Sequence, residues 1–317
     1  MQIGYKLSSE EHPANDLIRY AERAEEAGFG FAAISDHYHP WIDKQGHSPF
    51  VWSVLGGLAH ATERMSFFTA VTCPTMRIHP AVIAQAAATT ATMMPGRFAL
   101  GVGTGELLNE HILADHWPET NVRLEMLEEA VDVMRLLWEG GQRTHEGKHY
   151  VVENAKLYDL PDVPIPVYVA ASGDKAAGVA GRIGDGLIAT SPNPDTVKTF
   201  EGSGGEGKVE YAEATVCWGP SEAEAAETAL EWWPNSSLPG ELGQVLSTPA
   251  HFEQAAELVT EEKIARSIPC GPDAERYLDS IREYAEAGYD GVFVHQIGPD
   301  QDGFIDFFKR EVMPKIG

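Results

Sequence analysis

The chain has 317 residues, 43% of them hydrophobic, so it can bury a substantial core. Its 48 acidic and 23 basic residues give a formal net charge of −25, which disfavours nucleic-acid binding through phosphate neutralisation. No apolar run is long enough to cross a bilayer, the chain does not begin with a signal-peptide pattern, and its three scattered cysteines suggest neither a disulfide framework nor a metal knuckle. We expect a cytoplasmic protein without a membrane partner. Because an acidic, lysine-poor surface suits strong salt, we also infer a halophilic source.

Strand-like and helix-like segments alternate along the chain, as in a parallel α/β protein. About eight strands are present, the number that closes a parallel barrel, so we predict a single (β/α)8 TIM-barrel domain over residues 1–317, with insertions over its carboxyl face. A doubly wound sheet is the alternative, but it needs a glycine fingerprint after the first strand, where Tyr5-Lys6-Leu7-Ser8-Ser9 has none. The expected strands are Ile3–Leu7, Phe31–Ile34, Met65–Val71, Arg97–Val102, Val167–Ala171, Gly186–Ala189, Glu210–Trp218 and Gly291–His295, and the expected helices are Pro13–Ala27, Phe50–Ala61, His79–Met93, Leu124–Trp138, Lys175–Arg182, Glu222–Trp232 and Asp273–Ala287.

Three segments interrupt this alternation. Gln142–Glu153 has the pattern of a β-hairpin about Glu146-Gly147, whereas Asn193–Lys208 and Asn235–Thr260 are rich in Gly, Pro and Ser and are expected to be irregular. Insertions of this kind usually lie over the carboxyl face of a barrel, where they shape the substrate pocket.

Two strings imitate known motifs without the required context. His145-Glu146-Gly147-Lys148-His149 matches the HExxH zinc string, but a glycine within a hairpin keeps the two histidines off a shared helical face. Gly202 to Gly207 followed by Lys208 imitates a phosphate loop, but Val209 replaces the magnesium-binding Ser or Thr. No GxSxG elbow is present. We therefore expect no metal site and no nucleophilic catalysis.

Two strand ends carry candidate chemistry. Asp36 and His37 follow the strand that ends at Ile34, and Trp41 lies four residues beyond His37. Side chains at the carboxyl ends of barrel strands converge on the ligand, so this pair indicates a proton-transfer site; the alternative is that Asp36 caps the next segment and His37 only packs. A second strand ends in Gly101-Val102-Gly103-Thr104-Gly105-Glu106, where a flat ligand can approach the backbone while Glu106 and Asn109 point into the mouth, unless the segment is only a tight turn.

Five motifs in order resemble the F420-dependent glucose-6-phosphate dehydrogenase family, which belongs to the bacterial-luciferase-like barrels. The resemblance runs from Gly4 to about Ser191 and resumes near Pro249. It implies an F420-dependent dehydrogenase that transfers hydride from the carbinol carbon of a sugar or secondary alcohol to the deazaflavin, and it implies a homodimer. With the charge, it suggests a haloarchaeal member. The motifs are Ser35-Asp36-His37 with Trp41, Gly46-His47-Ser48-Pro49-Phe50, Ala70-Val71-Thr72-Cys73-Pro74-Thr75, Gly101 to Glu106 with Asn109, and Val167 to Gly173.

The resemblance also implies roles for individual residues. His37 is the leading general base, Glu10 competes for that role, Trp41 shapes the pocket, and Glu106 supports the charge that arrives on the reduced ring. Ala70-Val71 corresponds to a non-prolyl cis peptide of the family. The residues expected to bind coenzyme F420 are Asp36, His37, Ala70, Val71, Thr72, Glu106, Asn109, Ser172 and Gly173.

The departures from the family concern the substrate. The family holds a sugar phosphate with two lysines and an arginine; here Asn193 stands at the first lysine position, Gly243 or Gln244 lies near the second, and Arg266 matches the arginine loosely. Losing two cations weakens a phosphate clamp, so we expect an unphosphorylated sugar or a simple secondary alcohol, bound by Trp41, Asn193 and Arg266. Glucose 6-phosphate stays open if another cation such as Lys263 reaches the phosphate.

Other functions fit the same barrel. A luciferase-like flavin monooxygenase or a methylene-tetrahydromethanopterin reductase is the enzymatic alternative. A cofactor-storage or partner-binding barrel is the non-enzymatic one, and the titratable cluster of Asp36, His37 and Glu106 argues against it.

Overall fold

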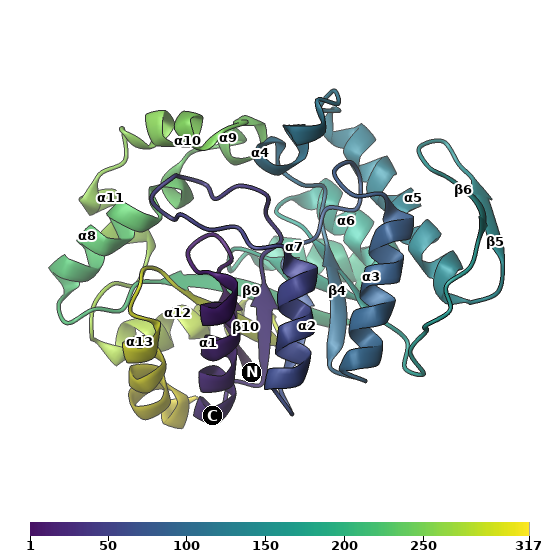
Figure 1. The fold of residues 1–317 in the computed structure, drawn as a ribbon. Coiled ribbons are helices and arrows are strands. Elements are labelled where there is room, and N and C mark those ends of the chain that lie inside the picture. The colour runs from purple at the N-terminus through teal and green to yellow at the C-terminus, as the bar shows by residue number, and fades with distance from the viewer. Residues whose placement is uncertain (317) are drawn as a thin grey trace.

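Short apolar runs such as Phe31–Ile34, buried along their whole length, form a closed barrel of parallel strands (Figure 1). The structure, a computed structural model, describes residues 1–316. Within them, eight strands close the barrel in the order β1, β10, β9, β8, β7, β4, β3, β2, which confirms the predicted fold class. The barrel strands are β1 (Gln2–Leu7), β2 (Phe31–Ile34), β3 (Ser66–Thr69), β4 (Phe98–Val102), β7 (Val167–Ala170), β8 (Gly186–Ala189), β9 (Val209–Val216) and β10 (Gly291–Gln296).

Most of the longer helices surround the barrel and bury one face against it. The first is typical: it buries Leu17, Tyr20 and Ala24 and ends at Gly28, whose φ of 103° few other residues adopt. The helices are α1 (Ala14–Ala27), α2 (Val51–Ala61), α3 (Pro80–Met93), α4 (Leu107–Glu110), α5 (Thr120–Trp138), α6 (Asp174–Ile183), α7 (Pro194–Phe200), α8 (Glu222–Trp232), α9 (Leu242–Val245), α10 (Pro249–Ala256), α11 (Glu261–Ser267), α12 (Ala274–Glu286) and α13 (Gln301–Phe307).

The barrel interior is filled by aromatic rings. Phe31, Phe68, Tyr168, Tyr211 and Phe293 belong to one buried cluster, with ring centroids of Phe31 and Tyr211 4.8 Å apart and those of Phe68 and Tyr211 5.4 Å apart. Filling the interior with side chains is the usual arrangement of an eight-stranded barrel. It leaves space for a ligand at the mouth above these rings.

The predicted hairpin is confirmed as β5 (Arg143–Glu146) paired antiparallel with β6 (Val151–Ala155). His145 Nε2 lies 3.1 Å from Glu129 Oε1 and His149 Nε2 lies 3.6 Å from Glu125 Oε2, both carboxylates on α5. The two histidines of the HExxH string therefore fasten the hairpin to a helix.

The segments expected to be irregular are partly helical, so that expectation was wrong. Asn193–Lys208 contains α7 and a π turn, Glu201–Gly205, and Asn235–Thr260 contains α9 and α10. Asn193 and Thr248 cap α7 and α10, because their side-chain oxygens accept hydrogen bonds from backbone N–H groups at the helix starts.

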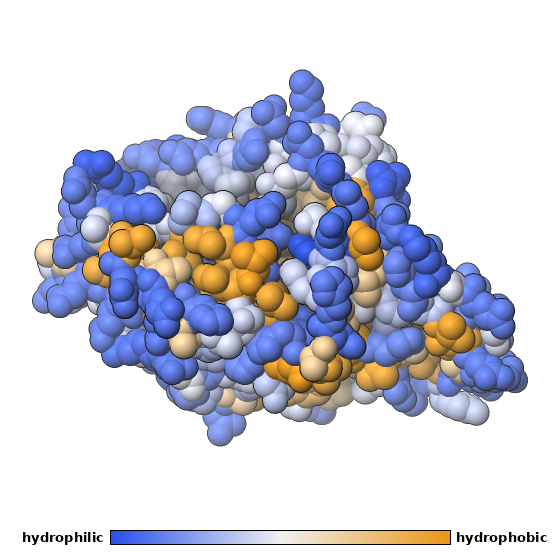
Figure 2. All heavy atoms as spheres, turned by 90° about the horizontal axis from the view of Figure 1, so that it is seen from above, coloured by the Kyte–Doolittle hydropathy of each residue, from blue (hydrophilic) through white to orange (hydrophobic). Residues whose placement is uncertain are grey.

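Figure 2 views the molecule from above, onto the carboxyl ends of the strands, and shows a largely hydrophilic surface with local apolar patches. No helix in residues 1–316 has both the length and the apolar character needed to span a bilayer. Cys73, Cys217 and Cys270 are buried free thiols.

Candidate active site

A cavity of about 990 Å³ opens at the carboxyl ends of the barrel strands. Its volume is at the upper end of the range for ligand pockets and has room for a large organic ligand together with a small one. Eight of the residues expected in the site line it, from five different strand ends: Glu10, His37, Trp41, Ala70, Val71, Glu106, Ser172 and Gly173.

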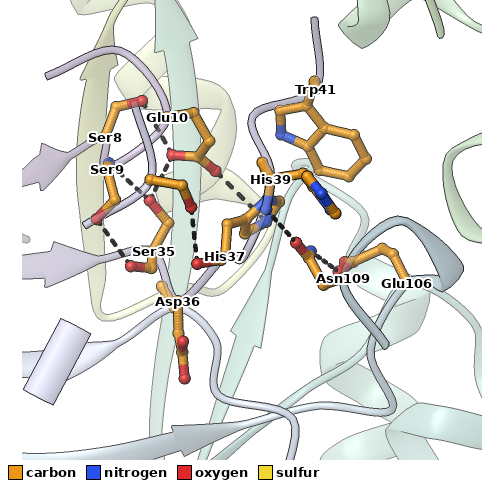
Figure 3. Close-up of polar contacts among 12 residues, drawn as sticks. Ser8, Ser9, Glu10, Ser35, Asp36, His37, His39, Trp41, Glu106 and Asn109 are labelled. Atoms are coloured by element: carbon orange, nitrogen blue, oxygen red, sulfur yellow. Dashed lines mark hydrogen bonds and ion pairs between the residues drawn. The ribbon is translucent and has the colours of Figure 1, made fainter. Parts of the chain in front are cut away.

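The side chain of His37 faces a carboxylate across the base of this cavity (Figure 3). Its Nε2 lies 3.4 Å from Glu10 Oε1, and its Nδ1 lies 3.1 Å from the carbonyl oxygen of His39. Because a carbonyl oxygen only accepts, Nδ1 carries the proton of the neutral ring and Nε2 is left as the proton acceptor. The ring can therefore take up a proton at Nε2 and hold the resulting charge against Glu10.

Glu10 is buried but kept ionised. Ser8 Oγ and Ser35 Oγ donate to its Oε2 at 3.2 and 2.5 Å. Burial alone would raise the pKa of Glu10, but the charges of His37 and Lys6 and the hydrogen bond from Ser35 outweigh it and lower the pKa. Glu10 is therefore a negative charge next to His37 Nε2.

Trp41 forms the wall next to this pair. Its ring lies 5.0 Å from that of His37 and 5.1 Å from that of Phe252, centroid to centroid. Its backbone N–H donates to Gln45 Oε1 at 2.8 Å, which fixes the loop after β2. The couple of His37 and Glu10 is thus covered on one side by aromatic rings that limit the access of water.

Asn109 stands behind Glu106 and does not line the cavity. Its Oδ1 accepts from the backbone N–H groups of Tyr38 at 2.9 Å and His39 at 3.2 Å, and its Nδ2 donates to Glu106 Oε2 at 3.4 Å (Figure 3). Asn109 therefore ties the loop after β2 to the loop after β4. It orients Glu106, which does face the cavity.

Asp36 and Thr72, both expected at the cofactor, also lie outside the cavity lining. Successive side chains of an extended chain point to opposite sides, so His37 enters the cavity and Asp36 turns away from it (Figure 3). Thr72 Oγ1 donates to Asp36 Oδ2 at 2.8 Å and Arg77 Nη2 donates to Oδ1 at 2.9 Å. Arg77 also contacts Glu110, whose pKa burial raises to about 7. This buried cluster supports the loops that carry the site.

The Ala70-Val71 peptide bond is cis, as the resemblance implied. Both residues line the cavity. Two strands further round the barrel, after β7, Ser172 and Gly173 precede α6, and the first residues of that helix line the same cavity.

Two residues expected to bind substrate do not reach the cavity. The side chain of Asn193 caps α7 by accepting from the N–H of Asp195 at 3.0 Å, and the exposed Arg266 pairs with Glu262 at 2.5 Å. Lys263 donates to the carbonyl oxygen of Ser237. Gly243 and Gln244, near the second lysine position of the family, do line the cavity.

The structure adds charged residues that the sequence reasoning missed. Six carboxylates line the cavity against two lysines, so its wall is acidic. Some of these groups belong to buried strands, where polar residues among apolar ones are the signal that was available. The missed carboxylates are Asp174, Glu213, Glu241 and Glu283 and the missed lysines are Lys6 and Lys175, whereas Glu10 and Glu106 were expected.

Comparison with known proteins places these features in context. A family model described as luciferase-like monooxygenase matches residues 1–291. The chain is 35% identical to the F420-dependent glucose-6-phosphate dehydrogenase of Beutenbergia cavernae, covering 100% of this chain and 97% of that protein, and 38% identical to that of Kribbella flavida, covering 100% and 98%. A solved structure described as an F420-dependent secondary alcohol dehydrogenase in complex with an F420-acetone adduct superposes with a TM-score of 0.92 at 32% identity, covering 98% of both chains. The two dehydrogenases named here are bacterial and give no support to a haloarchaeal source.

Proposed function

Because the chain belongs to the luciferase-like monooxygenase family and is homologous to the F420-dependent glucose-6-phosphate dehydrogenases, we propose that it is an F420-dependent dehydrogenase. It transfers hydride from the carbinol carbon of a sugar or secondary alcohol to the deazaflavin. The observation that carries the proposal is the His37–Glu10 couple at 3.4 Å in a cavity large enough for cofactor and substrate together. A binding protein has no need of such a couple.

The residues present fit a deazaflavin. Ala70 and Val71 offer a small apolar surface for a flat ring, and Gly103 and Gly105 let backbone approach it closely. Ser172 and Gly173 would hold the tail at the start of α6. Asp36, Thr72 and Asn109 act from behind, by fixing the loops that carry His37 and Glu106. When bound, the cofactor supplies the acceptor for the hydride.

The protein's own residues handle the proton. His37 Nε2 takes the hydroxyl proton while the carbinol C–H bond breaks with both its electrons and the C=O bond forms. Glu10, held ionised by Lys6 and Ser35, stabilises the imidazolium. Trp41 and Phe252 shield the couple from water. Glu106, oriented by Asn109, presents a carboxylate to the same cavity.

The substrate is unphosphorylated. With six carboxylates and two lysines on the cavity wall, a phosphate would meet net repulsion. Lys6 is already engaged by Glu213 at 3.1 Å, and Lys175 donates to Asn121 at 3.2 Å. Neither Asn193 nor Arg266 supplies a replacement contact.

The test is to offer the protein coenzyme F420 with 2-propanol, D-glucose or glucose 6-phosphate. Reduction of the cofactor is monitored as the loss of the absorbance of its oxidised form. We expect turnover with at least one neutral alcohol or sugar, at a higher kcat/KM than with glucose 6-phosphate. Reduction of the cofactor by none of them, or tight binding of a flavin instead, would support the monooxygenase or reductase alternative.

The oligomeric state, domain assignment, source and cellular location are proposed from the sequence alone. Homodimer formation comes from the family resemblance, and the single-domain assignment over residues 1–317 comes from the strand and helix pattern. The halophilic source rests on the charge of −25, and the cytoplasmic, reducing location rests on cysteine usage.

A further inference from the structure

Three polar side chains on strands β1 and β9 form one wall of the cavity and do not themselves take up the substrate proton. These are Lys6, Glu213 and Thr215, here called the polar wall. Glu213 and Thr215 alternate along β9 with buried apolar residues, so their side chains point to the same side, into the mouth. A buried strand that carries polar residues at this spacing needs partners for them.

The polar wall has hydrogen-bonding capacity to spare. Lys6 Nζ donates to the carbonyl oxygen of Ala70 at 3.2 Å and to Glu213 Oε2 at 3.1 Å, which uses two of the three N–H groups of the ammonium. Within residues 1–316 the third N–H has no partner, although the side chain is only 7% exposed. The Thr215 hydroxyl also makes no hydrogen bond to any group within residues 1–316.

Glu213 is held as a charged acceptor. His295 Nδ1 lies 3.5 Å from its Oε1, and His295 Nε2 lies 2.8 Å from Glu11 Oε2 on the far side. Burial alone would raise the pKa of Glu213, but Lys6 and His295 outweigh it and lower the pKa to about 2. Positive and negative groups thus alternate, and this alternation holds the polar wall in one geometry. Their order is Lys6, Glu213, His295 and Glu11.

The polar wall lies beside the proton-accepting couple. The charge of Lys6 is among those that lower the pKa of Glu10. Trp233 packs its ring 4.4 Å from that of His295, centroid to centroid, and lines the cavity with Trp41 and Phe252. A substrate at His37 therefore has aromatic rings on one flank and the polar wall on another.

We propose that the polar wall binds hydroxyl groups of the substrate, so that the substrate is a neutral polyol and not a monofunctional secondary alcohol; this rests on the dehydrogenase function proposed above. A hydroxyl both donates and accepts, which matches the free N–H of Lys6, the carboxylate of Glu213 and the hydroxyl of Thr215. An alkyl group in that place would leave the third N–H of Lys6 and the hydroxyl of Thr215 without partners, and sites built to bind a hydroxyl discriminate strongly against analogues that lack it. The C–H faces of a polyol can lie against the aromatic rings.

The test compares D-glucose with 2-propanol as F420-dependent substrates of the wild type and of Thr215→Val, which keeps the side-chain shape. We expect the wild type to favour D-glucose by at least about tenfold in kcat/KM. Thr215→Val should lower kcat/KM for D-glucose about three- to tenfold, the value of one neutral hydrogen bond, and change 2-propanol by less than about twofold. Lys6→Met should lower it for D-glucose about ten- to a hundredfold. Thr89→Val, which removes an exposed hydroxyl on α3 outside the cavity, should change kcat/KM for neither substrate.

A preference for 2-propanol, or equal losses for both substrates in Thr215→Val, would overturn the proposal even if Lys6→Met fails to fold. Titrating the cofactor-free protein with each alcohol, followed by NMR, tests the polyol site independently of the dehydrogenase function. D-glucose should shift the Thr215 methyl resonance, and 2-propanol at the same concentration should not. If that shift appears while no alcohol reduces F420, the polyol site stands and the dehydrogenase proposal fails; if F420 is reduced without such a shift or selectivity, the polyol site fails alone.

Discussion

Two neighbouring glutamates each contact a histidine, and the two contacts have different surroundings. Glu10 lies 3.4 Å from His37 at the cavity, and Glu11 lies 2.8 Å from His295 within the barrel wall, where both side chains are fully buried. His295 also faces Glu213 at 3.5 Å, so it lies between two carboxylates, and their hydrogen bonds and charges outweigh burial and raise its pKa to about 9. Its proton stays in place at neutral pH.

The first couple differs in what surrounds it rather than in its chemistry. The hydrogen bonds of Ser8 and Ser35 occupy the far oxygen of Glu10, and both His37 and Glu10 line the cavity. A histidine held between two anions keeps its proton, whereas one that faces a single anion and a cavity can exchange it with a ligand. Access to the ligand, more than the His–Glu contact, decides which couple can act as a base.

The largest expected effect is on the cavity couple. His37→Ala should lower turnover by roughly two to four decades and change cofactor affinity by no more than a few fold, because the ring moves the proton and is only one of several groups expected at the cofactor. Steady-state kinetics with a fluorescence titration of cofactor would measure both. Near-normal turnover would move the base role to Glu10, and Glu10→Gln in the same assay would then show the larger loss.

The buried couple should govern stability. His295→Asn leaves the buried Glu11 without its cation, while Glu213 keeps Lys6 at 3.1 Å, and we expect this to cost about 3–5 kcal/mol in the free energy of unfolding. The folded pKa of about 9 exceeds the ordinary value of 6.5, so the stabilisation is complete below about pH 6.5 and is lost as pH rises to 9. Denaturant unfolding across this range would measure the decline, and the slope should flatten in His295→Asn. An unchanged slope would contradict the charge assignment of His295.

A smaller effect is expected on the preference for a charged or a neutral substrate, when a residue that lines the cavity is changed. Gln244→Lys should improve kcat/KM for glucose 6-phosphate relative to D-glucose roughly tenfold or more, since one partly desolvated charge-assisted contact is worth about 1.5–3 kcal/mol. Asn193→Lys is the matched control. Asn193 caps α7 outside the cavity, so its replacement should leave the ratio unchanged and cost about 1 kcal/mol of stability. A gain from Asn193→Lys alone would restore the substrate role first expected for this position.

The smallest expected effect is the screening of surface charge by salt. The net charge of −25 lies largely on exposed carboxylates, and molar salt should relieve their repulsion by roughly 1 kcal/mol in total, raising the melting temperature by a few degrees. The deficit of His295→Asn should persist at every salt concentration, because a fully buried pair is hardly screened. A flat melting temperature for the wild type would contradict the halophilic source.

The fold could be predicted because strand and helix periods are local. Phe31–Ile34, Gly186–Ala189 and Glu222–Trp232 match the structure end to end, and the barrel follows from the strand count. The helices around Asn235–Thr260 escaped prediction because they are short and depend on caps. The sequence before α10 does contain the cap, Thr248 followed by Pro249, so the signal was present but was outweighed by the Gly and Pro content.

The candidate site was predicted where motifs fix local backbone. His37, Trp41 and Glu106 lie at the cavity because each belongs to the loop after a barrel strand. Asp36 was misplaced because two consecutive residues at a strand end cannot both face the mouth, and a motif does not say which one does. The contacts among Lys6, Glu213 and His295 join β1, β9 and β10, which are far apart in sequence, and no local pattern reports them.

The insertion between β9 and β10 has a consequence for how this protein can diverge. The proton-accepting couple hangs from β1 and β2, whereas Trp233, Gln244 and Phe252 all belong to that one insertion. Substitutions there can reshape what the pocket admits and leave the spacing of His37 and Glu10 untouched. The part of selectivity that the insertion carries is thus inherited separately from the couple, and exchanging residues 217–290 between relatives is a way to transplant that part without rebuilding catalysis or the polar wall.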